Sequence, residues 1–260
     1  MNVLNFKRML GHLWGFQRAE DRDVILIYHS VAGGALSTPE VRFREQMDWL
    51  RDNAQVMTLD TLLNTPNNGE LRVALSFDDG YRTLYDTAYP ALAERGFPAI
   101  VYLNSGLLGE GQHFPSTPEL GHYPGEYFLT WGEVAHLCAH GWAVGGHGVD
   151  HLDLTRASAT EIRRQLVDCK AQIEDRLNTT CHHFSYTWGR YSPLVRAAVM
   201  AAGFRSAVSG LHGRVMSSSD RYALPRIDIR PEYELCDFVD VVTGRWDYLG
   251  IKQRLARRLA

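Results

Sequence analysis

Short apolar runs alternate with amphipathic helical patterns along most of this chain, and this alternation constrains the fold more than any other feature. Helical spacing recurs around Phe43–Ala54, over 83–94 and 131–140, and after Ser158, which fits a capping box with Glu161. Between these segments we predict buried strands at 24–28, 73–77, 99–103, 142–144, 183–186, 205–208 and 226–229. Strands separated by crossover helices predict a parallel sheet. A (β/α) barrel holds this many units in one domain, so we predict an α/β barrel over residues 1–260.

The composition restricts which kinds of binding partner and which cellular location we expect. The formal net charge of -3 provides no basic surface for nucleic acid, so we expect no nucleic-acid partner. We find no apolar leader and no stretch long enough to cross a bilayer, which predicts a cytoplasmic protein. Residues 3–17 and 249–260 are amphipathic and basic. Each is predicted to be a helix that either docks on the domain or makes a peripheral contact with the inner face of a membrane.

Two motifs supply side chains suited to metal chemistry. SFDDG (76–80) places Asp78 and Asp79 where a strand ends, at the rim that carries catalytic residues in β/α proteins. Neighbouring side chains at a strand end point in opposite directions, so one carboxylate can bind a metal while the other accepts a proton. The alternative is a simple turn with a capping aspartate.

The second motif, HGVDH, contains His147 and His151, which face one point if the backbone turns helically. Two unrelated surface histidines are the alternative for this motif alone. Together, the two motifs predict an Asp–His–His site for one divalent metal that activates water. Zinc is expected first, and cobalt, nickel or iron fit the same donors.

A third motif, YHSV, places His29 at the end of the first predicted strand and hence on the same rim. A histidine there can protonate a leaving amine, and a buried structural histidine is the alternative. The loop 109–127 is long and polar, and it contains His113 and His122. Long loops in compact domains are often functional, so this loop is expected to border the substrate.

These motifs resemble those of the polysaccharide deacetylase family, the NodB-homology carbohydrate esterases, over about residues 23–230. SFDDG is similar to the family's T-F-D-D-G, and GWAVGGHGVDH is similar to its G-H-E-I-G-S-H-[ST]-x-x-H. The resemblance implies a distorted (β/α)7-type barrel in which Asp79, His147 and His151 bind the metal and Asp78 is the general base. It implies hydrolysis of an N-acetyl group to a free amine and acetate.

The chain also departs from the family pattern. Gly148 stands where a hydroxyl residue is usual, and this change is expected to loosen the loop. Tyr186 and Trp188 lie in the segment similar to R-x-P-Y-G, without its arginine and proline, and are the candidates for substrate or oxyanion contact. The late L-x-H motif is missing, so His29 is predicted to be the general acid. Arg226 is expected either to pair with Asp78 and keep it ionised or to form a structural salt bridge.

The sequence therefore predicts a hydrolase that removes an N-acetyl or other N-acyl group, such as formyl, from an amino sugar. The expected partner is an N-acylated amino-sugar glycan or a sugar precursor, in lipopolysaccharide O-antigen, capsule or exopolysaccharide biosynthesis. Two alternatives stay open: an amide hydrolase on a small non-sugar molecule, and an inactive carbohydrate-binding relic. The sugar, the linkage and the oligomeric state are not indicated by the sequence.

Overall fold

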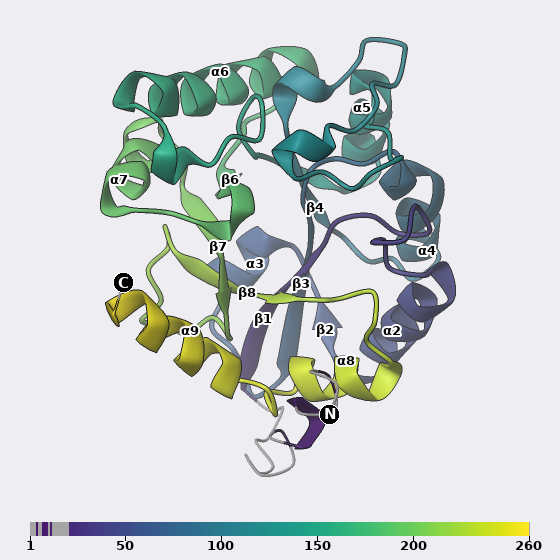
Figure 1. Cartoon of the computed structure of the whole chain (residues 1–260). Helices are drawn as coiled ribbons and strands as arrows, with labels where there is room; N and C mark the ends of the chain where they lie inside the picture. Colours follow the sequence, from purple (N-terminus) through teal and green to yellow (C-terminus); the bar gives the residue numbers. More distant parts are fainter. Residues whose placement is uncertain (1–3, 5–6, 10, 12–20, 260) are drawn as a thin grey trace.

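Seven parallel strands close into a barrel in the computed structural model, which describes residues 4, 7–9, 11 and 21–259, with side chains as far as residue 255 (Figure 1). Strand β1 pairs with both β3 and β8, and this double pairing closes the ring in the order β1-β8-β7-β6-β5-β4-β3. The predicted (β/α)7-type barrel is therefore confirmed. The barrel strands are β1 (Arg22–Tyr28), β3 (Leu71–Phe77), β4 (Ile100–Leu103), β5 (Ala143–Gly146), β6 (His183–Ser185), β7 (Ser206–His212) and β8 (Leu224–Asp228).

A further short strand, β2 (Gln55–Val56), distorts the barrel. It pairs with Arg72 and Val73 in the first half of β3, whereas β4 pairs with Ser76 and Phe77 at the end of the same strand. Strand β3 therefore has two successive neighbours along one edge. The sequence did not predict β2, because two residues are too few to show a period.

Both faces of the strands are buried, which explains their apolar composition. Every second side chain of a strand points into the barrel. There an inner cluster forms from Ile25, Ala74, Ile100, Tyr102, Val208 and Leu224. Helix α3 (Leu59–Asn64) adds Leu59 and Leu62 to this cluster. Asp60 of α3 contacts His183 at the start of β6, so this helix plugs the end of the barrel where the strands begin.

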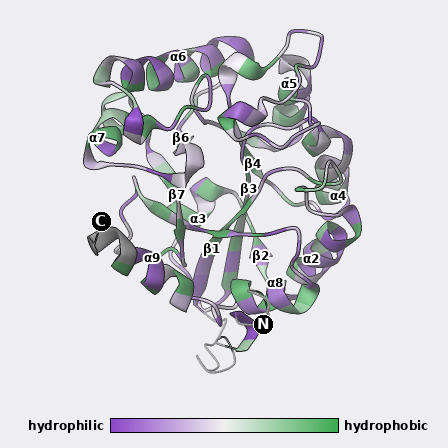
Figure 2. Cartoon of the chain, viewed as in Figure 1, coloured by the Kyte–Doolittle hydropathy of each residue, from purple (hydrophilic) through white to green (hydrophobic). Residues whose placement is uncertain are grey.

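The remaining helices pack around the outside of the barrel and carry both hydrophobic and hydrophilic residues (Figure 2). Their buried residues form the larger core cluster between helices and strands. These helices are α2 (Glu40–Asn53), α4 (Tyr89–Ala93), α5 (Trp131–Ala139), α6 (Ala159–Leu177), α7 (Pro193–Ala201), α8 (Leu235–Val242) and α9 (Tyr248–Leu259).

Two helix predictions need correction. The helix expected over 83–94 is a π-helical turn, η1 (Leu84–Ala88), followed by α4. The Ser158 hydroxyl accepts from the Glu161 N–H at 3.2 Å, as a cap should, but the Glu161 carboxylate pairs with Arg164 and does not complete a capping box.

The two chain ends meet the domain differently. Most of the predicted N-terminal helix, 3–17, lies outside the described residues. Arg8, which is described, forms a bidentate ion pair with the buried carboxylate of Asp237, with both contacts at 2.6 Å. Helix α9 confirms the predicted C-terminal helix and exposes Ile251 and Leu255. Among the described residues, every helix is too short or too polar to cross a bilayer.

We expect Asp247→Ala to destabilise the fold by about 3 kcal/mol, because it leaves a buried charge without its partner. Arg22 at the start of β1 is 1% exposed, and its guanidinium binds the Asp247 carboxylate at 2.7 and 2.8 Å and the Val242 carbonyl at 2.8 Å. Urea unfolding followed by circular dichroism measures the effect. Asp52→Ala, which removes an exposed ion pair with Arg51, is the control and should leave the midpoint unchanged. Equal midpoints for both variants would contradict the proposed role of Arg22.

Candidate metal-dependent active site

The closed barrel brings the three sequence motifs to one rim. Asp78 and Asp79 follow β3, His147 follows β5, and His29 follows β1. In a parallel barrel all strands end on the same side, so residues far apart in the sequence meet there. Asp79 has a left-handed backbone with φ +70°, and its carboxylate faces the two histidines.

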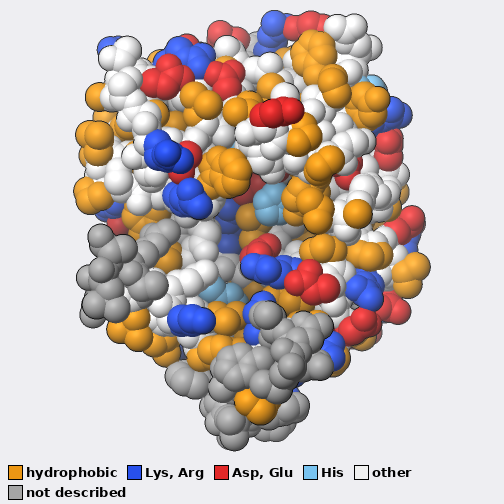
Figure 3. All heavy atoms as spheres, in the orientation of Figure 1, with side chains coloured by type: hydrophobic (Ala, Val, Ile, Leu, Met, Phe, Trp, Pro, Cys, Tyr) orange, Lys and Arg blue, Asp and Glu red, His pale blue; other side chains and the backbone are white. Residues whose placement is uncertain are grey.

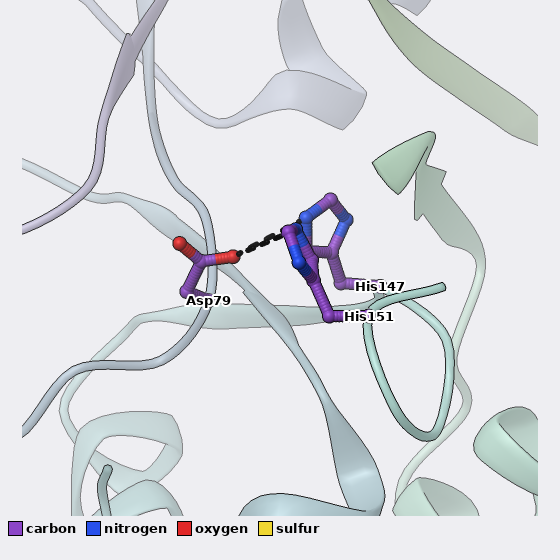
Figure 4. A group of neighbouring side chains, drawn as sticks. All are labelled: Asp79, His147 and His151. Carbon is purple, nitrogen blue, oxygen red and sulfur yellow. Dashed lines mark ion pairs between the residues drawn. The ribbon is translucent and has the colours of Figure 1, made fainter. Parts of the chain in front are cut away.

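Asp79, His147 and His151 form a buried group of potential metal ligands (Figure 4). Asp79 Oδ1 lies 3.4 Å from Nε2 of His147 and 3.4 Å from Nε2 of His151, and the three donor atoms all lie within 4.8 Å of one another. Asp79 Oδ1 is buried and accepts no hydrogen bond from the described residues. One carboxylate oxygen and two imidazole nitrogens converging in this way fit a divalent transition metal.

Backbone carbonyls orient both imidazoles toward this point. His147 Nδ1 lies 2.8 Å from the Ser185 carbonyl oxygen, and His151 Nδ1 lies 2.7 Å from that of Leu120. A carbonyl only accepts, so each Nδ1 carries the proton and donates it. In the neutral rings the Nε2 lone pairs are therefore left for a metal, which is the usual arrangement around metal-binding histidines.

The charges around the group also suit a cation. Burial favours the neutral form of His147, but the carboxylates of Asp78 and Asp79 outweigh it and raise the pKa of the imidazole. Burial lowers the pKa of His151 to about 4. The site therefore holds His151 neutral and attracts a positive charge next to His147, which a metal ion supplies in place of a proton.

The loop between the two histidines is not a helical turn, and this part of the prediction is wrong. Residues 147–151 bend sharply, with φ +82° at Gly148 and +57° at His151. Gly148 does not loosen the loop, because the Gln165 side chain of α6 stabilises it: Gln165 Oε1 accepts from the N–H groups of Val149 at 2.6 Å and Asp150 at 3.1 Å. A Cβ at position 148 would lie 2.9 Å from that oxygen, so glycine leaves room for it.

Asp78 pairs with Arg226, which is one of the two interactions expected for this arginine. The two side chains are buried and form parallel contacts of 2.7 and 2.8 Å, and the Ser185 hydroxyl donates to Asp78 Oδ2 at 3.0 Å. Burial would raise the pKa of the Asp78 carboxyl, but the Arg226 guanidinium outweighs this effect and keeps the pKa below its usual range. Asp78 is therefore ionised, and its Oδ2 lies 4.0 Å from His147 Nε2.

A cavity of about 480 Å³ opens onto these groups, and Figure 3 shows the hollow in this face of the molecule. His29 and Trp188 line it, together with Tyr123 from the long loop. The His29 ring lies 5.6 Å from that of Tyr123. Trp188 is 47% exposed, has φ +59°, and its ring lies 5.5 Å from that of His151.

Tyr186 does not face this cavity, which corrects the prediction that it contacts the substrate. Its side chain is buried, its hydroxyl donates to the Tyr222 carbonyl at 2.9 Å, and its N–H donates to the Val208 carbonyl at 3.1 Å. Tyr186 therefore supports the turn that presents Trp188.

The long loop borders the site, as expected, through His122 and not through His113. The His122 ring lies 4.5 Å from the His151 ring, whereas His113 Nε2 lies 2.9 Å from the Glu133 carboxylate of α5. The loop also supplies the Leu120 carbonyl that orients His151. The sequence did not indicate Leu120, Ser185 or Gln165. These residues act on the site by hydrogen bonding to the ligands or to their loop, and residues with this role form no recognisable motif.

We expect Gln165→Leu to weaken metal binding about tenfold, because the loop between the two histidines loses its hydrogen bonds while all three ligands remain. Competition with a chromogenic chelator measures the affinity. Gln55→Leu on the exposed strand β2 is the matched control and should bind metal as the wild type does. Wild-type affinity in Gln165→Leu would show that Gln165 does not position the ligands.

The chain is similar in sequence to proteins that are named as deacetylases. YxkH of Bacillus subtilis (strain 168), named as a polysaccharide deacetylase, is 28% identical over 213 residues, which cover 80% of this chain and 71% of that protein. The poly-beta-1,6-N-acetyl-D-glucosamine N-deacetylase of Staphylococcus aureus (strain MRSA252) is 23% identical over 224 residues, which cover 81% of this chain and 72% of that protein.

Solved structures share the fold. The deacetylase PplD of Streptococcus pyogenes, solved in complex with acetate, aligns with a TM-score of 0.73 at 21% identity, over 85% of this chain and 98% of that one. IcaB from Ammonifex degensii aligns with a TM-score of 0.74 at 20% identity, over 87% of this chain and 97% of that one. Residues 65–207, more than half of the chain, match the sequence model of the polysaccharide deacetylases. The chain therefore belongs to the polysaccharide deacetylase family.

Proposed function

We propose that this protein is a metal-dependent N-deacetylase that hydrolyses the acetamide group of an amino sugar. The observation that carries the proposal is the position of Asp78, an ionised carboxylate 4.0 Å from one of three converging metal donors, at the base of an open cavity. A zinc ion is the first candidate for Asp79, His147 and His151, and it would supply Lewis acidity to the amide carbonyl.

We assign the other steps of hydrolysis to individual side chains. Asp78 is the general base and accepts a proton from the attacking water. Arg226 holds Asp78 in place and ionised, and the Ser185 hydroxyl fixes the orientation of the carboxylate. His29, across the cavity, donates a proton to the leaving nitrogen. The products are acetate and a free amine, and the proton taken from water balances the one given to the amine.

Trp188 is the proposed contact for the sugar and the acetyl group. Its exposed ring forms part of the cavity wall beside His151, where it can stack on a sugar face. Its backbone N–H is the candidate oxyanion donor.

The Staphylococcus aureus relative acts, by its name, on poly-beta-1,6-N-acetyl-D-glucosamine, which favours an N-acetylated glycan or its precursor as substrate here. We therefore propose a role in surface polysaccharide assembly. Lipopolysaccharide synthesis, removal of formyl groups and a cytoplasmic location with a peripheral membrane contact stay predictions.

A paired measurement on two adjacent aspartates tests the mechanism. Wild-type protein should contain about one metal ion per chain and release acetate from N-acetylglucosamine oligomers. Asp79→Ala should lose both properties, because it removes a ligand. Asp78→Asn should keep the metal and lose acetate release by about 100-fold or more, because it removes only the base.

Elemental analysis and an acetate assay give the two readouts. Metal lost from Asp78→Asn but kept by Asp79→Ala would reverse the roles proposed for the two carboxylates. Wild-type protein that binds no metal after addition of zinc, cobalt or iron would exclude the mechanism.

We expect His29→Gln to lower kcat for acetate release by about 100-fold with unchanged metal content, because the leaving amine loses its proton donor. His113→Gln is the matched control: it changes a histidine of the loop whose ring contacts Glu133, outside the cavity. Full activity in His29→Gln would assign the proton donor elsewhere.

A further inference from the structure

The cavity extends from the metal ligands to a cationic end on the opposite side of the barrel mouth. The ligands follow β3 and β5, whereas this end lies beside β7 and β8 in the ring. Lys7, Arg230 and Lys252 line it, from the N-terminal segment, the connection after β8 and helix α9. Figure 3 shows Lys and Arg side chains around the hollow.

Acidic residues neutralise this end only in part. Of the carboxylates that line the cavity, Asp78 pairs with Arg226 and Asp79 belongs to the metal group. Asp228 is the remaining one, and its carboxylate lies 3.3 Å from Arg230 Nε. Glu232 and Asp237, outside the cavity lining, also act on Lys7 as negative charges. Lys7 and Lys252 form no ion pair with any described carboxylate, so the end keeps an excess of positive charge.

The direct contacts of Lys7 with the described residues are with uncharged groups. Its ammonium lies 3.4 Å from the Tyr233 hydroxyl and over the rings of Tyr233 and Trp246, at 5.6 and 5.7 Å. Burial lowers its pKa, and the neighbouring Arg230 charge lowers it further. An anion bound between these cations would relieve their repulsion and favour the charged form of Lys7.

We infer that Lys7, Arg230 and Lys252 bind a phosphate or diphosphate group of the substrate, so that the enzyme deacetylates a phosphorylated amino sugar. The inference rests on the proposed deacetylase function and specifies its substrate class. Two lysines that form no ion pair with a described carboxylate, together with Arg230, suit the multiple charges of a phosphate better than the single charge of a uronic acid. A cavity of about 480 Å³ is within the usual size for small-molecule sites and holds a sugar together with its phosphate.

The geometry gives each end of such a substrate its own contacts. The acetamide group lies at the metal ligands and Asp78, next to Trp188. The phosphate lies across the barrel mouth, where Lys252 and Arg230 are exposed and Lys7 is half-buried. The cations contact a group of the substrate that does not react. They therefore determine which substrate is bound and hydrolysed, whereas the reaction itself takes place at the metal ligands and Asp78.

Substrate preference in the metal-loaded enzyme is the direct test. We expect kcat/KM for N-acetylglucosamine 1-phosphate to exceed that for N-acetylglucosamine about tenfold at low ionic strength, and the preference to shrink in high salt. Lys252→Gln should reduce the preference about threefold to fivefold. Arg163→Gln on α6 removes an exposed positive charge away from the cavity and should leave the preference at the wild-type value.

A metal ion also attracts phosphate, so a binding measurement is needed to distinguish anion binding at the cationic end from anion binding at the metal. Calorimetric binding of inorganic pyrophosphate should weaken in Lys252→Gln and persist in Asp79→Ala. Loss of binding in Asp79→Ala with none in Lys252→Gln would place the anion on the metal and overturn the inference. Equal kcat/KM for the neutral and phosphorylated sugars would also overturn it while leaving the deacetylase function intact, whereas hydrolysis of neither would count against the function itself.

Two sources of the phosphate are distinguished by two further substrates. A nucleoside diphosphate N-acetylhexosamine tests a soluble activated sugar, and a polyprenyl diphosphate N-acetylhexosamine in detergent micelles tests a lipid-linked one. A higher kcat/KM than for the neutral sugar with either substrate supports the inference and names the source. No gain with either, and none with N-acetylglucosamine 1-phosphate, would overturn it.

Discussion

The pairing of β1 with both β3 and β8 is the constraint on which the rest of the structure depends. It closes the barrel and brings the ends of β1, β3, β5 and β8 to one mouth. Without closure, the carboxylates after β3 and the guanidinium of Arg226 on β8 would lie on separate edges of an open sheet. Closure places them in contact, at 2.7 and 2.8 Å, in a position with almost no solvent.

That buried contact organises the chemistry. A carboxylate in a closed interior would normally take up a proton, and the fixed guanidinium keeps it ionised. Asp79, one residue later, takes a left-handed backbone and turns to the two histidines. Two adjacent residues thus acquire different environments, one suited to holding a proton acceptor and the other to holding a cation.

Support for the metal ligands comes from segments that are remote in sequence. The carbonyls of Ser185 and Leu120 orient the two imidazoles, and Gln165 stabilises the loop between them. These contacts compensate for the missing hydroxyl at Gly148, and the carboxamide occupies the space that a side chain there would need. The altered motif therefore reflects a different way of holding the same loop, which argues against an inactive relic.

The sequence by itself determined the barrel, the positions of its strands and the two motifs whose residue types suit a metal. Each of these depends on local periodicity or on a contiguous motif whose residue types limit the chemistry. Only the tertiary structure decided that His147 and His151 converge through a bend and not through a helix. It also decided that Tyr186 faces the core, that Gln165 and Ser185 support the site, and that three cations gather at the far end of the cavity. These features depend on which side chains meet across the barrel, and such contacts between distant segments leave no pattern in the linear sequence.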